Sequence, residues 1–519
     1  MKRLIVCCDG TWNNPEEEEN GIVAPTNVVK FYNALASEDL NGIKQLSYYH
    51  PGLGGEDSGI VDEILGGALG VGIGRHISSA YHWLGNNYEE GDEIYLYGFS
   101  RGAFTVRSLG GMLGKGLLDL RGVPSDKSWE RVKKAYEKGY RKSSSITKWA
   151  QDDWTFFNNR EKMPIHFIGV WDTVGALGIP DDLEILNIFD NKKKWQFHDT
   201  ELGDNVTSAR HAMAMDEIRS MFSVTRWTNA SECNDALEVW FPGAHSDVGG
   251  GYAHTDLSNG ALKWMIDESR AKGLLFREET DELILDNSLG AMHNSYKGIF
   301  SKLRSRPRNL PEVSEINQDK FHSSVFKRQE KSPLEYPPYH QSQTLEVGES
   351  LTIEIFADTR WNKTQLYLGK NQSFTFSATG KWVDSKDVCD WRGAENDEFT
   401  VGDIVRAGSS FLGQFEVFFK KVLKNQSIDF IGTKRVEDMR WFTMVGAIAN
   451  DAGISATEKS NVVSNDGSAV EHQYVDLTEH EIVPLVIQNP GYLYCFANDV
   501  WSLYKNNHGS VHLTVTRKE

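Results

Sequence analysis

Residues 92–113 read DEIYLYGFSRGAFTVRSLGGML and join a strand pattern to a helix pattern through one short turn. Residues 93–99 form an apolar and aromatic run typical of a buried strand, and a helix-like run follows from about Arg101. The turn, Gly-Phe-Ser-Arg-Gly, places Ser100 between two glycines. A strand, a tight turn with small residues around a serine, and a helix together form the signature of a nucleophile elbow, which exposes the serine hydroxyl at the edge of an α/β sheet. A plain strand-to-helix turn is the alternative interpretation.

Further strand patterns occur on both sides of this stretch. They are RLIVCCDG (3–10), PIHFIGVWD (164–172) and LEVWFPGAH (237–245), and each apolar run ends in Gly, Asp or His. Helix-like segments lie between them, and buried strands that alternate with helices predict a parallel sheet covered on both faces. In such sheets the functional groups collect at the carboxyl ends of the strands.

The chain changes character twice after this region. Residues 260–341 are polar and contain proline-rich pieces, so we expect irregular structure that wraps the first domain, and a boundary near Ser342. Apolar and polar residues then alternate with a period of two, which is typical of strands that are buried on one face. These runs are SLTIEIFAD (350–358), SFTFSATGKW (373–382), GYLYCFAND (491–499) and SVHLTVTR (510–517). The predicted fold is an α/β domain with a doubly wound, mostly parallel sheet over residues 1–341, followed by an all-β sandwich over residues 342–519.

Composition narrows the function classes. The chain has 519 residues, 39% of them hydrophobic, and a formal net charge of −18. Such a surface repels a nucleic-acid backbone, so we expect no nucleic-acid partner. The five cysteines include no C-x-x-C pair, which argues against a zinc site or a disulfide framework and favours buried free thiols.

Neither a membrane span nor a secretory signal is predicted. The apolar, glycine-rich run at residues 64–74 is about half as long as the ~20 residues that a spanning helix needs. The apolar run at the N-terminus stops at Asp9, which is too early for a signal peptide. We therefore expect synthesis in the cytoplasm, with any export carried by a machine that needs no signal peptide. Residues 50–74 favour close helix packing, and the alternative is an apolar lip for a lipid chain.

A serine hydroxyl is a weak nucleophile at neutral pH and needs a base and an orienting acid. In doubly wound hydrolases these follow the serine in the order acid, then histidine, at later strand ends. Asp172 directly follows one strand pattern, and His245 lies in a glycine-rich loop after the next. We therefore predict Ser100 as nucleophile, Asp172 as acid and His245 as base. Asp247, two residues after His245, is the second-choice acid.

Other polar residues in this region receive a different interpretation. The run RHAMAMDEIRSMF (210–222) is predicted to be an amphipathic helix, on which His211, Asp216 and Glu217 would form surface ion pairs. Asp172 could also be a strand-end cap, and His245 a loop histidine without a catalytic role.

The oxyanion of the reaction needs backbone N–H donors. The N–H of Arg101, directly after the serine, is the first candidate, and Gly10 or Thr11 at the end of the first strand is the second. Asp9 could instead handle a phosphate or a metal ion, but neither a D-x-D pair nor a P-loop follows it. The predicted chemistry needs no cofactor.

Taken together, these motifs resemble a known family. The segments CDGTWNN (8–14), GFSRGAFTVRSLGG (98–111), VWDTVGALG (170–178), HAMAMDE (211–217) and GAHSDVGGGY (243–252) are similar to those of the α/β-hydrolase family that includes bacterial type VI secretion lipase effectors of the first class. The resemblance extends from residue 3 to about residue 340. It implies phospholipase A activity at a membrane surface, with Ser100, Asp172 and His245 as the triad. It also implies an antibacterial or host-directed effector with a secretion-machine or immunity-protein partner.

The C-terminal part resembles another family. The segments ATGKW (378–382) and NDVWSLYKNNHGSVHLTV (498–515) are similar to the calcium-dependent galactose-binding lectin of the LecA type. The resemblance implies calcium held by Asp499, Asn506, Asn507 and the backbone carbonyl of Leu503, together with a carbohydrate. Carboxylate and amide oxygens are ligands that calcium takes. The alternative is a scaffold whose turns are stabilised by these Asn and Asp side chains.

The sequence thus predicts a serine ester hydrolase that acts on lipid acyl esters, with the β-sandwich as a targeting module. The rival hypothesis is a carbohydrate-binding protein. In that case the lectin-like module is the working part, and the hydrolase domain is a scaffold or removes acyl groups from a glycan.

Overall fold

The computed structural model describes residues 1–10, 18–19, 21–52, 68–175, 201–302, 304–331, 339–384, 387–394, 434–450, 472–501 and 504–519. The first part of the chain is built on a 6-stranded sheet in the order β4-β1-β5-β6-β7-β8. Every neighbouring pair in this sheet is parallel, as the sequence predicts. The strands are β1 (Arg3–Cys8), β4 (Gln45–His50), β5 (Glu93–Phe99), β6 (Ile165–Trp171), β7 (Val206–Ala214) and β8 (Ala236–Phe241).

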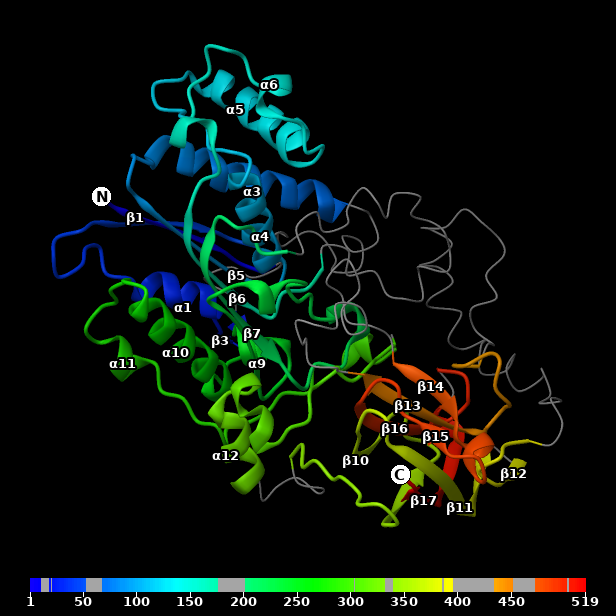
Figure 1. Cartoon of the computed structure of the whole chain (residues 1–519). Helices are drawn as coiled ribbons and strands as arrows, with labels where there is room; N and C mark the ends of the chain where they lie inside the picture. Colours follow the sequence, from blue (N-terminus) through cyan, green and yellow to red (C-terminus); the bar gives the residue numbers. More distant parts are fainter. Residues whose placement is uncertain are drawn as a thin grey trace.

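Helices cover both faces of this sheet (Figure 1). On one face lie α3 (Ala68–Asn87), α4 (Arg101–Leu113) and α5 (Ser125–Lys134), and on the other α1 (Asn27–Ala34) and α10 (Asp256–Ala271). The sheet has a hydrophobic core on each face, because successive side chains of a strand point to opposite faces. In β1, for example, Leu4 and Val6 join the core under α4, whereas Ile5 and Cys7 join the core under α1.

Shorter elements complete this part of the chain. They are β2 (Glu18–Glu19), β3 (Ile22–Val23), α6 (Ile146–Trp149), α9 (His245–Gly249), α11 (Thr280–Leu283) and α12 (Ser323–Lys331).

Two expectations about this part are wrong. Residues 210–222 do not form an amphipathic helix: they continue β7 to Ala214 and then form a loop with a short 3-10 turn at Ser220–Phe222. Two of the polar residues are buried within the strand, where Arg210 pairs with Glu268 and His211 contacts Glu238, and Asp216 and Glu217 lie in the loop that follows it. The region after residue 260 is also not irregular throughout, because α10 continues to Ala271.

The described residues of the C-terminal part form two antiparallel sheets, in agreement with the predicted β domain. One sheet has the order β10-β16-β13-β14 and the other β12-β11-β17-β9, with β15 paired to β11. The strands are β9 (Ser350–Phe356), β10 (Asn362–Leu368), β11 (Ser373–Asp384), β12 (Asp387–Cys389), β13 (Met444–Asn450), β14 (Gln473–Asp476), β15 (Leu485–Val486), β16 (Gly491–Ala497) and β17 (Asn507–Arg517). All four runs with period two form strands, and each contributes apolar residues to one shared core.

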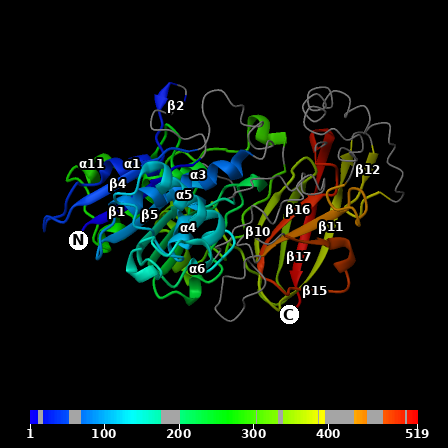
Figure 2. The ribbon, with the colours of Figure 1, turned by 90° about the horizontal axis from the view of Figure 1, so that it is seen from above.

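The two parts lie side by side and share an apolar junction (Figures 1 and 2). Strand β16 shows how it forms. Its residues Leu493 and Cys495 face the core between the β-sheets, whereas Tyr492, Tyr494 and Phe496 belong to a cluster that also contains residues of the first part. Those include Met213, Met215, Trp240, Leu310 and Val313. The boundary near Ser342 stays a prediction.

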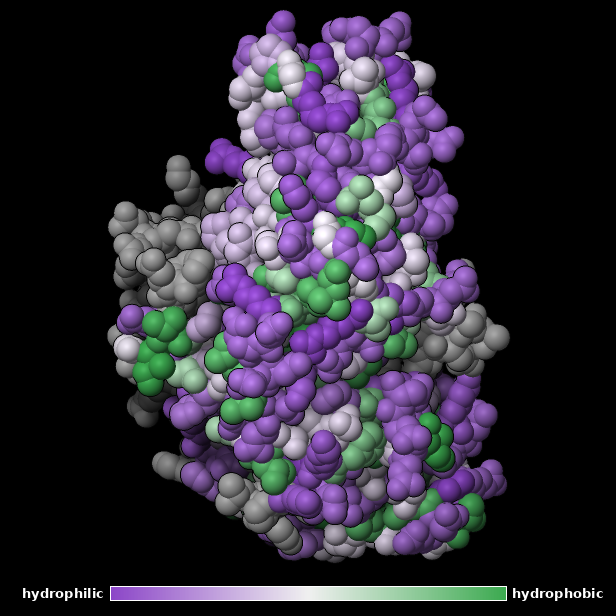
Figure 3. All heavy atoms as spheres, turned by 90° about the vertical axis from the view of Figure 1, so that its left-hand side faces the viewer, coloured by the Kyte–Doolittle hydropathy of each residue, from purple (hydrophilic) through white to green (hydrophobic). Residues whose placement is uncertain are grey.

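The face of the first part drawn in Figure 3 is largely hydrophilic, and its hydrophobic side chains form small scattered groups. None of the helices in the described ranges combines the length and the apolar character that crossing a membrane requires.

Candidate active site

Ser100 lies at the turn between β5 and α4 in a conformation that few non-glycine residues adopt. Its φ is 56° and its ψ is −122°. Glycine is required on both sides, because a Cβ at Gly98 would lie 2.4 Å from the backbone oxygen of Gly102, and one at Gly102 would lie 2.1 Å from that of Cys8. The Ser100 side chain makes no cap hydrogen bond to the helix that it begins. This is the backbone geometry of a nucleophile elbow.

Asp172 and His245 meet at the carboxyl edge of the sheet. Asp172 directly follows β6, and His245 begins α9, the short helix after β8. The His245 Nδ1 atom lies 2.5 Å from Asp172 Oδ2, and both side chains are buried. The structure therefore brings together two residues 73 positions apart, in the relationship that orients a catalytic imidazole.

The His245 ring lies next to the end of the strand that carries Ser100. Its centroid is 4.6 Å from that of Phe99, the residue before Ser100, and 5.0 Å from that of Phe222. Gly249 makes the close approach of α9 to this strand end possible, since a Cβ there would lie 1.9 Å from the Phe99 ring. The Ser100 amide in turn donates to the backbone oxygen of Trp171, which precedes Asp172. The three predicted residues thus occupy one small region of the sheet edge.

The electrostatics favour an ionised Asp172 and a neutral His245. Burial raises the pKa of Asp172, but the charge of Arg308 and the contact with His245 outweigh it and hold the pKa well below its usual range. Burial lowers the pKa of His245, and the Asp172 carboxylate only partly opposes this. A neutral imidazole fixed by an ionised carboxylate can accept a proton.

Arg308 is a site residue that sequence reasoning misses. Its Nη1 donates to Asp172 Oδ1 at 3.1 Å, and its Nη2 donates to Asp172 Oδ2 at 3.0 Å. Nη2 also donates to the backbone oxygen of Phe222. Arg308 comes from the proline-rich segment, in which no local pattern marks one arginine among several.

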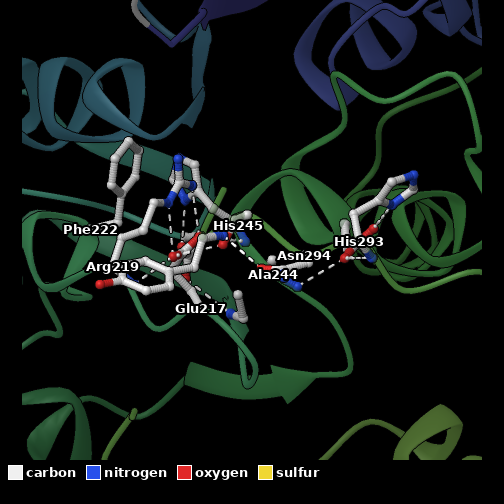
Figure 4. Close-up of polar contacts among 12 residues, drawn as sticks. Glu217, Arg219, Phe222, Ala244, His245, His293 and Asn294 are labelled. Carbon is white, nitrogen blue, oxygen red and sulfur yellow. Dashed lines mark hydrogen bonds and ion pairs between the residues drawn. The ribbon is translucent and has the colours of Figure 1, made fainter. Parts of the chain in front are cut away.

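The ion pair of Glu217 and Arg219 lies next to the backbone of His245. Glu217 accepts from the His245 amide and forms an ion pair with Arg219, whose Nη2 is 2.7 Å from Glu217 Oε2. The Arg219 guanidinium stacks on Phe222 with its carbon 3.7 Å from the ring centroid. Figure 4 shows Arg219, Phe222 and His245 grouped around Glu217, with His293 farther away on the other side of Ala244.

Asp247, the second-choice acid, lies elsewhere. Its Oδ1 is 2.6 Å from Nδ1 of His293, and its Oδ2 accepts from the amides of Ala244 and His293. The carboxylate that contacts the His245 side chain is that of Asp172. The prediction that Asp247 could orient His245 therefore has no support in this geometry.

His211 and Asp216 also differ from the predicted surface ion pairs, because His211 is buried and Asp216 is half-buried. The His211 Nε2 atom accepts from the amide of Thr173, directly after Asp172, while its Nδ1 contacts Glu238. Asp216 accepts from the Tyr339 hydroxyl and contacts His340 Nε2 at 2.8 Å.

The predicted oxyanion donors are only partly described. Arg101 is the first residue of α4, and Thr11 lies outside the described residues. The Gly10 amide donates at 2.7 Å to the carboxylate of Asp9, which also accepts from the hydroxyls of Thr26 and Tyr49. The loop after β1 nevertheless touches the elbow, because the backbone oxygen of Asp9 would lie 2.5 Å from a Cβ at Gly102.

Two of the four candidate calcium ligands, Asp499 and Asn507, lie in contact. Asn507 Nδ2 donates at 2.9 Å to Asp499 Oδ2, and both residues are buried. Asn506 Nδ2 instead donates to Asp384, and Leu503 lies outside the described residues. Asn507 Oδ1 is buried without a hydrogen-bond partner among the described residues, so one amide oxygen remains beside a buried carboxylate. Within the described ranges of the whole chain, no group of three or more His, Cys, Asp and Glu residues is arranged to hold a metal ion.

Comparison with known proteins gives a family. The family model for the type VI secretion phospholipase effector Tle1-like catalytic domain matches residues 2–268, which is more than half of the 519 residues. The uncharacterized protein YEL023C of Saccharomyces cerevisiae is 31% identical over 237 residues, which are 43% of this chain and 32% of that protein. The chain thus matches about a third of the length of its yeast relative.

Two solved structures are similar to the chain at a TM-score of 0.34 and 17% identity, and each similarity covers 55% of this chain. One is an uncharacterized protein from Pseudomonas aeruginosa, of which 49% is covered. The other is the Tle1 effector bound to the VgrG spike of the type VI secretion system, of which 76% is covered. By the match of its residues 2–268, the chain belongs to the family of Tle1-like phospholipase effectors of type VI secretion.

Proposed function

We propose that the chain is a serine ester hydrolase that cleaves acyl esters of glycerophospholipids, with Ser100, His245 and Asp172 as its triad. The observation that carries this proposal is the 2.5 Å contact between His245 Nδ1 and Asp172 Oδ2. The same His245 ring packs on Phe99, the residue before Ser100. Membership of a phospholipase effector family supports a lipid substrate.

The proposed reaction has two halves. His245 takes the proton of the Ser100 hydroxyl as its oxygen attacks the ester carbonyl carbon, and Asp172 stabilises the imidazolium that forms. The tetrahedral oxyanion accepts hydrogen bonds from the Arg101 amide and from the loop at Gly10 and Thr11. Since the Gly10 amide donates to Asp9 in this structure, its contribution requires that loop to rearrange.

Collapse of the intermediate breaks the ester bond, and His245 returns the proton to the departing lysophospholipid oxygen. An acyl group then remains on Ser100. Water, deprotonated by His245, attacks this acyl-enzyme and releases the fatty acid, which restores the serine. The chemistry requires no cofactor.

The test is lipid mass spectrometry on vesicles of mixed phospholipids. The wild-type chain is expected to produce lysophospholipid and free fatty acid in equal amounts, and Ser100→Ala is expected to produce neither. Free fatty acid at the wild-type rate from a folded Ser100→Ala variant would remove Ser100 from the mechanism. Release of phosphorylated headgroup instead of fatty acid would reject the reaction class.

We also propose that the chain acts as a secreted effector. Tle1, one of the similar proteins, is seen bound to a VgrG spike, and we extend this type of carrier to the present chain. The expected result is co-purification of a spike protein of the producing organism with the chain. A second expected result is arrested growth of bacteria that receive the chain in the periplasm, reversed by Ser100→Ala. Equal arrest by the wild type and by Ser100→Ala would contradict an effector role that depends on hydrolysis.

A second candidate function is binding of calcium and carbohydrate at Asp499 and Asn507. The Oδ1 of Asn507 favours it, because this atom has no hydrogen-bond partner among the described residues, its side chain contacts the buried Asp499 carboxylate, and calcium coordinates both types of oxygen. The test is retention on a galactose resin with calcium or EDTA. Calcium-dependent retention that Asp499→Ala abolishes and Asp358→Ala preserves is the expected result, and unchanged passage in calcium would reject the proposal. Asp358 is a suitable control because it is exposed.

A further inference from the structure

We infer that Arg308 is a positioning residue for Asp172, and that the C-terminal β-sheets hold Arg308 in place, so that the active site is completed across the junction between the two parts of the chain. The inference rests on the proposed function in one respect: it takes Asp172 as the acid of the triad.

Residues 304–309 lie between the two parts, and alternate residues bind opposite sides. The even-numbered residues bind the first part. The backbone oxygen of Arg304 accepts from the amide of Ser220, and the amide of Arg306 donates to Ile218. Arg308 then reaches Asp172 with both terminal nitrogens.

The odd-numbered residues bind the C-terminal part. The backbone oxygen of Ser305 accepts at 3.1 Å from Nε1 of Trp361. The backbone oxygen of Pro307 accepts at 3.0 Å from Nε2 of His472. The amide of the Asn309 side chain donates at 2.6 Å to the backbone oxygen of Asn450.

This alternation has a simple physical origin. In an extended chain, successive residues point to opposite sides, so a segment between two bodies can bind both at once. Apart from an isolated bridge at Ser305, residues 304–309 belong to no helix or sheet. Their position therefore depends on the partners on each side. Arg308 and Pro307 are adjacent, so the hydrogen bond from His472 fixes the backbone within one residue of the arginine.

The groups on the β side are themselves rigidly packed. The ring of His472 stacks on Tyr494 at 6.1 Å between centroids and contacts Trp361 edge-on at 5.6 Å. Burial lowers the pKa of His472 to about 3, so the ring is neutral at physiological pH and its Nε2–H is available to donate. The β part thus offers a preformed surface with donors placed for the segment.

The contact to Asp172 is more than a local ion pair. The Arg308 side chain has a relative exposure of 4% and that of Asp172 is 0%, so each charge needs the other. A bidentate guanidinium fixes the plane of a carboxylate as well as its charge. The plane of Asp172 determines the direction of the bond to His245, and therefore the aim of the ring toward Ser100.

The first test compares Arg308→Gln and Arg308→Lys with the full-length wild-type chain. Arg308→Gln loses the pair of hydrogen bonds from the guanidinium to Asp172. We expect this loss to lower kcat by about 100-fold with little change in KM, since small misplacements of catalytic groups have effects of this size. Removing the positive charge favours the imidazolium, so in Arg308→Gln the acid limb of the kcat/KM profile should move to higher pH. Arg308→Lys keeps the charge and should leave the limb near its wild-type position, with kcat only partly restored.

In the described part of the chain, the other titratable groups that act on Asp172 or His245 include His211, Glu217 and Arg219, and these variants leave all three unchanged. If Arg308→Gln does not fold, the test is made with Arg308→Lys, whose kcat should be lower than that of the wild type. An unchanged limb in a folded Arg308→Gln variant, or full activity in it, would overturn the positioning role.

The second test addresses the β part. His472→Phe keeps an aromatic ring and removes the donor to Pro307. A shift of the acid limb in the same direction as in Arg308→Gln is expected, with a loss of kcat of a few-fold to about tenfold. The control is His512→Phe, an exposed position on β17, in the sheet away from the junction. If His472→Phe and His512→Phe have the same profile, the β part does not hold Arg308.

Titration of His245 by NMR of histidine-labelled protein separates this inference from the proposed function. The pKa of the His245 ring should be higher in Arg308→Gln and in His472→Phe than in the wild type, whether or not the chain hydrolyses lipid. Absence of lipid hydrolysis with these shifts present would reject the proposed function alone. Hydrolysis that depends on Ser100, without the shifts, would reject the role of Arg308 alone.

Discussion

Arg308 binds both carboxylate oxygens of Asp172 from a position 136 residues farther along the chain. Each oxygen has a further donor or partner, because Oδ1 also accepts from the amide of Ala214 and Oδ2 contacts His245. The Asp172 carboxylate is thus held from β7, from α9 and from the segment at the junction. A carboxylate fixed in this way can orient an imidazole without having to reorganise during the reaction.

The two aspartates near the histidines should behave differently when they are neutralised. Asp172→Asn removes the acceptor that orients His245 and should lower kcat by roughly 10⁴-fold, as expected when the wrong imidazole tautomer is stabilised. Asp247→Asn weakens contacts to His293 and should cost at most about tenfold. Steady-state hydrolysis of a p-nitrophenyl acyl ester by both variants gives the comparison. Equal losses in the two would contradict the assignment of Asp172 as the acid.

The ion pair of Glu217 and Arg219 is expected to matter for stability. The Glu217 side chain has a relative exposure of 0%, so Glu217→Ala leaves the arginine and the His245 amide without their acceptor. The expected loss in free energy of unfolding is about 3–5 kcal/mol. The control, Glu137→Ala, breaks an exposed pair with Lys133 and should change this free energy by less than about 1 kcal/mol. Urea denaturation measures both, and similar midpoints for the two variants would count against a structural role of Glu217.

Asp499 should make the C-terminal part less stable as the pH rises. Burial raises the pKa of Asp499 to about 6 in the folded chain, from its ordinary value of 3.8. Between these values the folded state keeps a proton that the unfolded state has lost, so stability falls as the pH rises from about 4 to about 6 and stays lower above that. Asp499→Asn should therefore be more stable than the wild type at pH 8, by up to about 3 kcal/mol.

The measurement is thermal unfolding of the wild type and Asp499→Asn in EDTA at pH 4.5 and pH 8. A gap between their Tm values that does not widen at pH 8 would contradict the raised pKa. If calcium binds at Asp499, adding it at pH 8 should raise the Tm of the wild type and leave that of Asp499→Asn unchanged.

Two glycines of α4 offer a matched test of the elbow. A Cβ at Gly102 would lie 2.1 Å from the backbone oxygen of Cys8, whereas a Cβ at Gly110 would meet only side-chain atoms at 3.4 Å or more. Gly102→Ala should therefore lower both stability and activity, because backbone on both sides must move. Gly110→Ala should be neutral or stabilise the chain by about 0.5–1 kcal/mol, since alanine is the better helix former. Equal Tm values for the two variants would argue against the close approach of α4 to β1.

Local patterns predict the parts of this site that lie at strand ends. Ser100, Asp172 and His245 each follow an apolar run, and a parallel sheet delivers the ends of such runs to the same edge. Local patterns also predict the four C-terminal strands, because each strand has one face in the core between the β-sheets. In all these cases the information lies within about ten residues.

Residues 210–222 show where local patterns fail. Their polar residues recur at a spacing that fits a helix surface, but β7 lies inside the sheet and its polar side chains are neutralised by distant partners such as Glu238 and Glu268. Arg308 is missed for the same reason, since its partner is distant in sequence and its own surroundings are irregular. Pairs of buried charged residues that are distant in sequence produce no periodic pattern, so local patterns cannot predict them.

The most direct test of the proposed triad is covalent labelling of the folded chain with a fluorophosphonate, followed by mass spectrometry of its peptides. The expected result is one adduct per chain, at Ser100, which forms in the wild type and fails to form in His245→Ala. An adduct at another serine, or equal labelling of Ser100 in His245→Ala, would contradict the activation of Ser100 by His245.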